Sequence, residues 1–352
     1  MSATEGPQYR VRDGDIARDR EAVLAVWRGN LGQDARMARK YDWFYGRAPS
    51  GAPLLQLLEH EAGAAPVGVC AAGRRRMSHR GQPLCAGVLV DLAVAPDHRS
   101  LGPALMLQQG LFAAGKRELD LLYGFPNPKA APVFKRIGYR KFADMTRYAR
   151  VVRHASYARR RLAEKLPAPL AAAMAAMAGP AIDLLKRLDD ARRWPAARRY
   201  RVEWHERAPD IESLWRDSAK PDALTAVRDA AYLRWRFDEA PDARFRHLLL
   251  RDGDTSCAWF ATTHDDHTLQ VHDFWTLDGA TPAPEIIAAL LRAAYAMGHA
   301  TVSLELATSA QRLQPWLTLG FSDRGQRPLF GYWAQIADGS PDLHIVSADE
   351  DE

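Results

Sequence analysis

Two stretches of the 352-residue chain resemble each other, and this internal repeat limits the possible folds more than any other feature. The first, YDWFYGRAPSGAPLLQLLEH, begins at Tyr41, and the second, YLRWRFDEAPDARFRHLLL, begins at Tyr232. Aligning their Ala-Pro pairs places Trp43 opposite Trp235. A repeat of this length predicts two copies of one structural unit.

The match continues in the same order further along the chain. The segments VDLAVA and VHDFWTL place Asp91 opposite Asp273, and a Gly-Tyr pair at Gly138 meets a Gly-Phe pair at Gly320. The apolar runs LLQLLEH and VGVCAAG, on either side of a polar turn, are typical of hairpin arms, whereas REAVLAVWRGNL has helical spacing. We therefore predict an α/β (α+β) fold of two tandem domains, each a mixed, mostly antiparallel sheet flanked by helices.

Composition divides the chain into four segments. The first copy covers residues 1–153 and the second covers 200–337. Residues 154–199 between them form an Ala/Arg-rich helical connector, for which we expect one or two helices with a solvated basic face. Attachment of this connector to a membrane surface is the alternative, which its weak apolar face disfavours. Residues 338–352 form an acidic tail.

Charge and hydropathy exclude several classes of protein. The net charge of +5 suits phosphate-bearing partners but is too small for this length to indicate nucleic acid binding. Prolines interrupt the longest apolar tract, LPAPLAAAMAAMAGPAIDLL, so we expect no integral membrane segment. The N-terminal residues lack the apolar stretch of a signal peptide, and we expect a cytoplasmic protein. The three cysteines match neither a disulfide framework nor a zinc site, and no metal is expected.

The segment VDLAVAPDHRSLGPALML, from Val90 to Leu107, predicts a strand that turns sharply into a helix. Proline suits the first helical turn, where its missing N–H would have no partner in the helix. We expect the corner to direct backbone N–H groups toward one spot, from Arg99, Ser100, Leu101, Gly102 and Ala104. A pyrophosphate could approach the glycine closely and bind these donors at the positive end of the helix dipole.

This corner resembles the acyl-CoA signature of the GNAT superfamily of N-acyltransferases. The signature is Gln or Arg, two residues, Gly, one residue, then Gly or Ala, and Arg99, Gly102 and Ala104 fit it. A second family pattern follows at the expected distance, with conservative replacements at two places, over Asn127, Ala130, Phe134, Gly138 and Tyr139. The second copy has LDGATPAPEIIAALL instead of the signature. The resemblance therefore implies a tandem form with a degenerate second copy that binds no CoA.

The resemblance also implies where acetyl-CoA, or another acyl-CoA, would lie. In this family pantetheine lies beside the central strand, whose backbone faces the thioester oxygen. The corresponding backbone here is that of Leu92, Ala93 and Val94, and Phe134 falls at a position near the bound cofactor. Asn127 would hydrogen-bond the pantetheine arm, or cap the following helix, or do both.

The chemistry of acyl transfer requires a proton for the leaving thiolate and a base for the amine. The family often places a tyrosine as the acid where this chain has Phe134, so we predict Tyr123, ahead of Tyr139, with solvent as the alternative. Asp91 is the candidate base and would act through water. Its counterpart Asp273, in the copy without the signature, equally suggests a structural role.

Three functions follow from these residues. The first is N-acetyl transfer to a primary amine of a small molecule, such as an amino sugar or an amino acid derivative. The second is acylation of protein lysines, and the third is acyl-CoA binding without catalysis. The aromatic clusters that begin at Tyr41 and Tyr232 would either stack on a sugar or anchor helix to sheet. A homodimer is left open.

Overall fold

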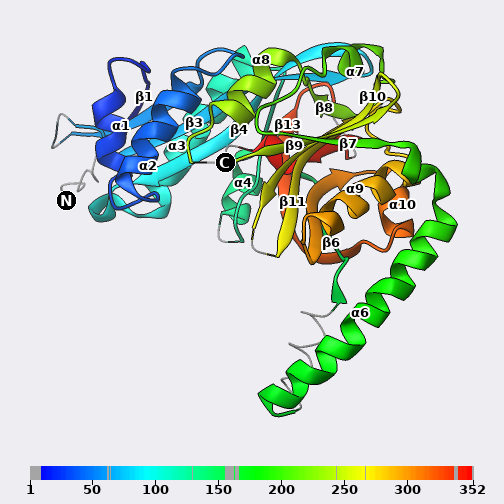
Figure 1. The fold of residues 1–352 in the computed structure, drawn as a ribbon. Coiled ribbons are helices and arrows are strands. Elements are labelled where there is room, and N and C mark those ends of the chain that lie inside the picture. The colour runs from blue at the N-terminus through cyan, green and yellow to red at the C-terminus, as the bar shows by residue number, and fades with distance from the viewer. Residues whose placement is uncertain are drawn as a thin grey trace.

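The chain folds into two copies of a similar order of helices and strands (Figure 1). The computed structural model describes residues 9–61, 63, 65–128, 130–154, 162, 166–242, 244–265, 267–336 and 340–350. The first copy comprises β1 (Tyr9–Asp13), α1 (Arg20–Trp27), α2 (Asp34–Lys40), a π-helical turn (Tyr41–Tyr45), β2 (Leu54–His60), β3 (Gly68–His79), β4 (Gln82–Val94), α3 (Leu101–Glu118), β5 (Leu121–Gly124), α4 (Ala131–Ile137) and β6 (Arg140–Val151).

The second copy follows the connector helix α6 (Ala168–Arg193) and repeats this order, with an additional short strand, β8 (Leu224–Ala226), between its first two helices. It comprises β7 (Arg201–His205), α7 (Glu212–Asp217), β8 (Leu224–Ala226), α8 (Ala230–Leu233), a π-helical turn (Arg234–Asp238), β9 (Arg246–Asp252), β10 (Thr255–His264), β11 (Thr268–Thr276), α9 (Pro284–Ala296), β12 (Thr301–Thr308), α10 (Ala310–Thr318) and β13 (Ser322–Trp333). A short strand, β14 (Leu343–Val346), follows. The prediction of two tandem α/β copies is confirmed, and a π-helical turn in the same place of each copy supports their common origin.

The last strand of each copy is inserted into the sheet of the other. β13 pairs with β5 of the first copy, and β6 pairs with β12 of the second. The two exchanged strands also pair with each other, so the copies share one continuous sheet in the order β1-β2-β3-β4-β5-β13-β6-β12-β11-β10-β9-β7. Boundaries drawn along the sequence at 153 and 200 therefore cut across the strand pairing, because neither copy completes its own sheet.

The aromatic clusters lie in the core between the two copies. The side chains of Tyr41, Trp43 and Phe44 are buried, as are those of Tyr232 and Trp235. Burial of these rings anchors helix to sheet and copy to copy through the largest apolar surfaces the chain has. Of the two alternatives, the structure therefore favours anchoring of helix to sheet over stacking on a sugar, since buried rings offer no face to a ligand.

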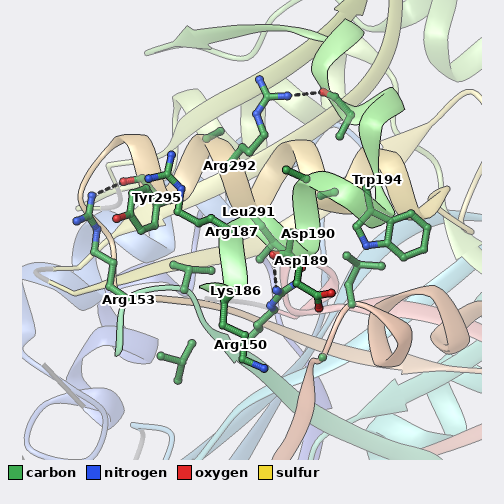
Figure 2. Close-up of a pocket in the computed structure, with 18 of the residues that line it drawn as sticks. Arg150, Arg153, Lys186, Arg187, Asp189, Asp190, Trp194, Leu291, Arg292 and Tyr295 are labelled. Atoms are coloured by element: carbon green, nitrogen blue, oxygen red, sulfur yellow. Dashed lines mark hydrogen bonds and ion pairs between the residues drawn. The ribbon is translucent and has the colours of Figure 1, made fainter. Parts of the chain in front are cut away.

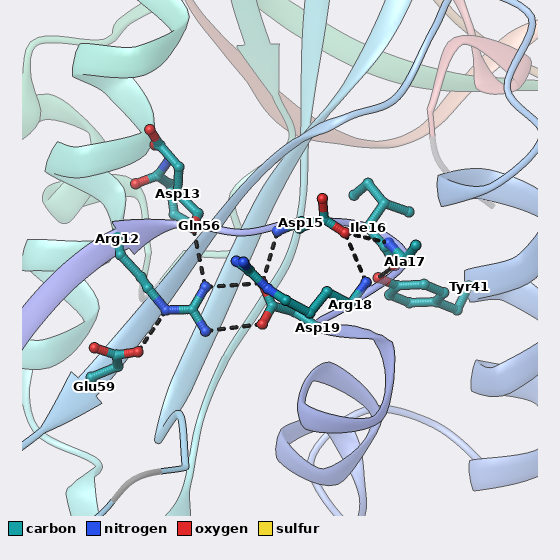
Figure 3. Close-up of polar contacts among 10 residues, drawn as sticks. All are labelled: Arg12, Asp13, Asp15, Ile16, Ala17, Arg18, Asp19, Tyr41, Gln56 and Glu59. Atoms are coloured by element: carbon teal, nitrogen blue, oxygen red, sulfur yellow. Dashed lines mark hydrogen bonds and ion pairs between the residues drawn. The ribbon is translucent and has the colours of Figure 1, made fainter.

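An ion pair holds the first strand to the start of α1 (Figure 3). The Arg12 guanidinium on β1 donates to the two carboxylate oxygens of Asp19 at 2.9 and 3.0 Å, and to Glu59 on β2 at 2.5 Å. Asp19 also accepts the backbone N–H of Asp15 at 2.8 Å. Chiefly through the hydrogen bond from Arg12, the pKa of Asp19 lies well below its usual range.

The connector helix α6 projects away from the rest of the molecule (Figure 1). Six of its exposed apolar side chains recur at alternating intervals of four and three residues, at Leu170, Met174, Met177, Ala181, Leu184 and Leu188, and Ile182 and Leu185 are exposed beside them. Met177 is 81% exposed. The apolar face is therefore stronger than expected for a solvated basic helix, and it has the spacing of a helix-pairing seam. Among the described helices, α6 included, none combines the length and hydropathy that a membrane crossing requires.

Residues 340–350 of the acidic tail are part of the folded core. β14 pairs in parallel with β8 and antiparallel with β12. Leu343, Ile345 and Val346 are buried, and so is Asp349 in the short helical turn that follows. Four consecutive residues of this segment thus form a strand, which its acidic composition did not indicate.

Candidate functional site

The central strand β4 of the first copy separates from its neighbour β5 partway along its length. The two strands pair in parallel only from Ala86 to Val88, opposite Leu121 to Tyr123. β4 then continues for six residues to Val94, while β5 ends one residue later at Gly124. Within the described residues, the edge of β4 that faces β5 has no strand partner beyond Val88. An open strand edge of this kind can pair with an extended ligand.

A β-bulge lies on this open part of β4. The register with β3 shifts between the pairs Ala71 with Val90 and Val69 with Ala93, and Asp91 in the bulge has a φ of 54°. The Asp91 side chain is only 5% exposed although the residue as a whole is partly exposed, so its backbone is what faces solvent. Bulges often re-aim backbone and side-chain groups next to active sites.

The carboxylate of Asp91 is engaged from two sides. The Lys40 ammonium lies 2.8 Å from one of its oxygens, and the Tyr45 hydroxyl donates to the other at 2.8 Å. The side chain of Lys40 is 8% exposed, so this ion pair is almost entirely buried. Neither Lys40 nor Tyr45 was predicted as a site residue, because only the folded chain brings them to Asp91 from about 50 positions away. The geometry favours a structural role for Asp91 while leaving its backbone exposed.

The strand-to-helix corner has the predicted form. β4 ends at Val94, a single helical turn covers Pro96–His98, and α3 begins at Leu101 with Pro103 in its first turn. At Gly102, nothing lies within 4 Å of the position that a Cβ would take. The space in front of this helix terminus is open to a bulky anion.

Two of the five N–H groups expected at this corner point elsewhere. The backbone N–H of Arg99 donates to Pro96 at 3.2 Å and that of Ser100 donates to His98 at 2.9 Å, because the preceding turn folds back on itself. The N–H groups of Leu101 and Gly102 belong to the first turn of α3, where the helix supplies no acceptor, whereas the i−4 position of Ala104 is the carbonyl of the N-cap residue Ser100.

Arg99 precedes α3, and its side chain forms hydrogen bonds at the strand-to-helix corner. Its Nε donates to the carbonyl of Val94 at 3.2 Å, and its guanidinium also donates to Asn30. A positive charge is thereby held between the end of β4 and the start of α3. Such a charge adds to the attraction that the helix dipole exerts on an anion.

The remaining predicted cofactor contacts lie around the same opening. Leu92, on the open part of β4, packs in one apolar cluster with Ala104 of α3 and Phe134 of α4. Val94 belongs to the same cluster, whereas Ala93 packs on the opposite face of the sheet. Residues from β4, α3 and α4 that are up to 42 positions apart are thus brought together.

Asn127 and Phe134 have clear local roles. The Asn127 side chain accepts the backbone N–H of Ala130 at 3.0 Å, which stabilises the turn before α4, whereas the N-cap residue of α4 is Ala130 itself and has no side-chain cap. Phe134 is buried, with its ring centroid 5.0 Å from that of Tyr139 and 6.1 Å from that of Phe330. Phe134 is therefore part of the core beneath the opening.

Tyr123 lies at the end of β5 with its hydroxyl turned away from the α3 side. The hydroxyl donates to the backbone carbonyl of Asp349 in the C-terminal tail at 2.7 Å. Burial raises the pKa of Tyr123 well above its ordinary value. Because the Tyr123 hydroxyl already donates to this carbonyl and its pKa is raised, it is poorly placed to protonate a thiolate.

The corresponding cleft of the second copy is filled by the chain itself. β11 and β12 pair in parallel only up to Val271 and Leu304, as β4 and β5 do in the first copy. Beyond that point β14 pairs with β12, with Leu306 opposite Val346. Leu306 also pairs with Thr146 of β6 on its other edge, so β14 lies on the edge that faces β11. The tail thus takes the place that an extended ligand would need.

No cluster of histidine, cysteine, aspartate or glutamate suited to a metal ion occurs in the part of the chain that the structure describes.

Comparison with known proteins identifies the fold. Neither the protein-family models nor the curated proteins include a match to this sequence. Solved structures do match: a probable N-acyltransferase from Enterococcus faecalis has a TM-score of 0.62 at 10% identity, covering 94% of this chain and 73% of its own. A GCN5-related N-acetyltransferase from Kribbella flavida has a TM-score of 0.58 at 14% identity, covering 94% and 72%. Another from Anabaena variabilis has a TM-score of 0.59 at 10% identity, covering 92% and 72%. The protein therefore has the fold of the GCN5-related N-acetyltransferases, in two tandem copies.

Proposed function

We propose that the protein is an acyl-CoA-dependent N-acyltransferase with one active site, in the first copy. It transfers the acyl group of acetyl-CoA, or of another acyl-CoA, to a primary amine of a small molecule by direct attack in a ternary complex. One observation carries this proposal: the edge of β4 is open between Val88 and Val94 directly beside the N-terminus of α3.

Each part of acyl-CoA has a matching feature at this site. The N–H groups of Leu101 and Gly102 would bind the pyrophosphate, with Ala104 leaving room beside them, and Arg99 adds a positive charge nearby. The open edge of β4 would pair with the amide groups of pantetheine. The exposed backbone at the Asp91 bulge would donate to the thioester oxygen as negative charge develops on it.

The reaction needs little further help from side chains. The neutral amine nitrogen attacks the carbonyl carbon, the carbon–sulfur bond breaks and the thiolate leaves, while solvent takes the proton that the nitrogen loses as the amide forms. Because the Tyr123 hydroxyl is engaged with Asp349, we propose that solvent protonates the thiolate, whose pKa near 8.5 makes it a tolerable leaving group. Positioning of the two substrates then supplies most of the rate enhancement.

Titration calorimetry with acetyl-CoA tests the site. Gly102→Ala places only a methyl group where the pyrophosphate should approach, so it should weaken acetyl-CoA binding much less than a charged side chain does. Gly102→Glu places a negative charge at the pyrophosphate position, and binding should fall below detection with the unfolding curve unchanged. If Gly102→Glu bound acetyl-CoA as tightly as the wild type does, this corner would not be the acyl-CoA site.

Turnover separates catalysis from binding alone. Release of free CoA thiol in the presence of a panel of small amines is expected from the wild type and not from Gly102→Glu. A second candidate, an acyl-CoA-binding module without catalysis, is favoured by Phe134 and by the engaged hydroxyl of Tyr123. Stoichiometric binding without thiol release from any amine, and without acyl transfer to lysate proteins, would support that module instead.

The four–three spacing of apolar residues on α6 supports a homodimer in which two α6 helices pair. Light scattering should then give twice the mass of one chain. Met177→Lys, which places a charge in the middle of the seam, should give the mass of a single chain.

A further inference from the structure

A cavity of about 1090 Å³ lies beneath the C-terminal half of the connector helix (Figure 2). α6 forms one wall, the end of β6 forms the second, and α9 with the start of the second copy forms the third. None of the residues lining this cavity lies on β4, α3 or β5. The cavity is therefore separate from the proposed acyl-CoA site, and its volume is at the upper end of the range for small-molecule sites.

The walls of this cavity are strongly cationic. Two carboxylates, Asp189 and Asp190, line it. Eight cationic side chains line it as well, namely Arg150, Arg153, Lys186, Arg187, Arg193, Arg198, Arg292 and Arg324. The Arg150 guanidinium pairs with Asp190 at 2.6 Å and that of Arg193 with Asp189 at 3.0 Å, which leaves a large excess of positive charge. Like charges gathered around a cavity repel each other unless an anion lies among them.

Two of the guanidinium groups that line the cavity each have a buried nitrogen. Nη1 of Arg150 and Nε of Arg153 are shielded from solvent and have no hydrogen-bond partner among the described residues. A buried donor without an acceptor is costly. Because protein atoms cover these two nitrogens, a ligand in the cavity would meet the partly exposed remainder of the two side chains. Both arginines come from the end of β6 and face the cavity (Figure 2).

An aromatic ring fixes two of the cations in place. The guanidinium carbons of Arg153 and Arg187 lie 3.9 and 4.2 Å from the centroid of the Tyr295 ring. Arg153 also donates to the backbone carbonyl of Tyr295 at 2.6 Å. Stacking restricts a guanidinium while leaving its N–H edge able to bind an oxyanion. The site is thus pre-organised on α6, β6 and α9 together.

The cavity has an apolar lining as well as a cationic one. Leu184 and Leu188 of α6, Leu291 of α9 and Trp204 of β7 all contribute to its walls. A small inorganic anion would leave this surface and most of the volume unused. A ligand that fits both properties has an anionic group and an apolar body.

We propose that this cavity binds an anionic amphiphile, an organic molecule with a phosphate or carboxylate group and an apolar portion. The anionic group contacts Arg150, Arg153 and Arg187, and the apolar portion lies against Leu291 and Trp204. Because the walls come from both copies and from the connector, the bound ligand holds α6 against the second copy. This proposal is independent of the acyl-CoA site.

Fluorescence titration with 1-anilinonaphthalene-8-sulfonate, an anionic amphiphile, tests the proposal on the full chain. Arg187→Ala should weaken binding of this dye by about tenfold, the effect of one charged contact. Arg117→Ala, which removes an exposed cation on α3, should bind the dye as the wild type does. N-phenyl-1-naphthylamine, which has the rings without the sulfonate, should bind weakly to all three proteins. Equal dye affinity in Arg187→Ala and the wild type would overturn the proposal.

Further measurements distinguish the possible ligands from one another and distinguish the cavity from the exposed apolar face of α6 as the place where the dye binds. Decyl phosphate should displace the dye, whereas displacement by inorganic phosphate at the same concentration would overturn the apolar part of the proposal. Co-sedimentation of the wild type, but not of Arg187→Ala, with phosphatidylglycerol vesicles would identify the amphiphile as a membrane lipid. Met177→Ser should leave the affinity unchanged, and a loss would place the dye on the exposed seam of α6 instead. Acetyl-CoA binding should be the same in Arg187→Ala, so failure here and failure of the proposed function are distinguishable.

Discussion

Trp43 and Trp235 exchange two hydrogen bonds across the boundary between the copies. The indole N–H of Trp43 donates to the backbone carbonyl of Trp235 at 2.7 Å, and the indole N–H of Trp235 donates to the carbonyl of Trp43 at 3.1 Å. Their rings stack with centroids 4.7 Å apart and planes 16° apart. Equivalent residues that contact each other reciprocally are the mark of a twofold axis. The two copies are therefore arranged as a dimer within one chain.

Replacing either tryptophan by phenylalanine should weaken the fold by a similar amount. Trp43→Phe retains an aromatic ring but leaves the buried carbonyl of Trp235 without its donor, at a cost of about 1–3 kcal/mol in the free energy of unfolding. Trp27→Phe is a matched control, because the N–H of Trp27 is buried without a partner among the described residues. Urea unfolding of the three variants should show a smaller loss for Trp27→Phe. Equal losses would mean that ring volume, and not the exchanged hydrogen bonds, stabilises the boundary.

The repeat predicted the fold class but not the exchange of the final strands. Alternating apolar residues identify a strand and its buried face, and β6 and β13 have the same pattern whichever copy they complete. Their pairing depends on how the copies are placed relative to each other, which a local pattern does not encode. Similarly, the run LHIV in β14 is too short to stand out in an acidic segment.

Asp91→Asn separates a structural role from a catalytic one. Asparagine tolerates the positive φ of this position but removes the charge opposite the buried ammonium of Lys40, so unfolding should become easier by about 3–5 kcal/mol. The double variant with Lys40→Met removes both charges and should recover most of that stability. If Asp91 is structural, thiol release should recover too. Turnover that stays low in the stable double variant, with the acidic limb of its pH profile lost, would identify Asp91 as the base.

Stability at the N-terminal edge should depend on pH through Asp19. Its pKa is lowered in the folded protein by the hydrogen bond from Arg12, so the unfolded state binds a proton more readily than the folded state does. The stabilisation is therefore complete above the ordinary carboxyl pKa of about 4 and is lost as pH falls toward the lower folded value. Chemical unfolding of the wild type and Asp19→Asn should differ most above pH 5 and converge toward pH 2. A difference independent of pH would show that shape, and not charge, matters at this position.

The corner of the candidate site could be predicted because glycine and proline constrain the backbone locally. Pro103 and Gly102 indicate where the helix begins and where its terminus is open, and the structure has both features. The turn over Pro96–His98, which captures the N–H groups of Arg99 and Ser100, depends on hydrogen bonds that sequence spacing does not specify. The engagement of Asp91 by Lys40 likewise depends on tertiary contacts.

The C-terminal tail should contribute to the stability of the whole chain. Ile345 is 1% exposed on β14, between β12 and β8, so Ile345→Ala should leave a cavity and lower the free energy of unfolding by about 2–4 kcal/mol. Asp342→Asn, at an exposed position just before β14, should change it by less than about 1 kcal/mol. Urea unfolding measures both. If Ile345→Ala is as stable as the wild type, the tail detaches in solution and the cleft of the second copy is open, and a second extended ligand per chain would then have a place to bind.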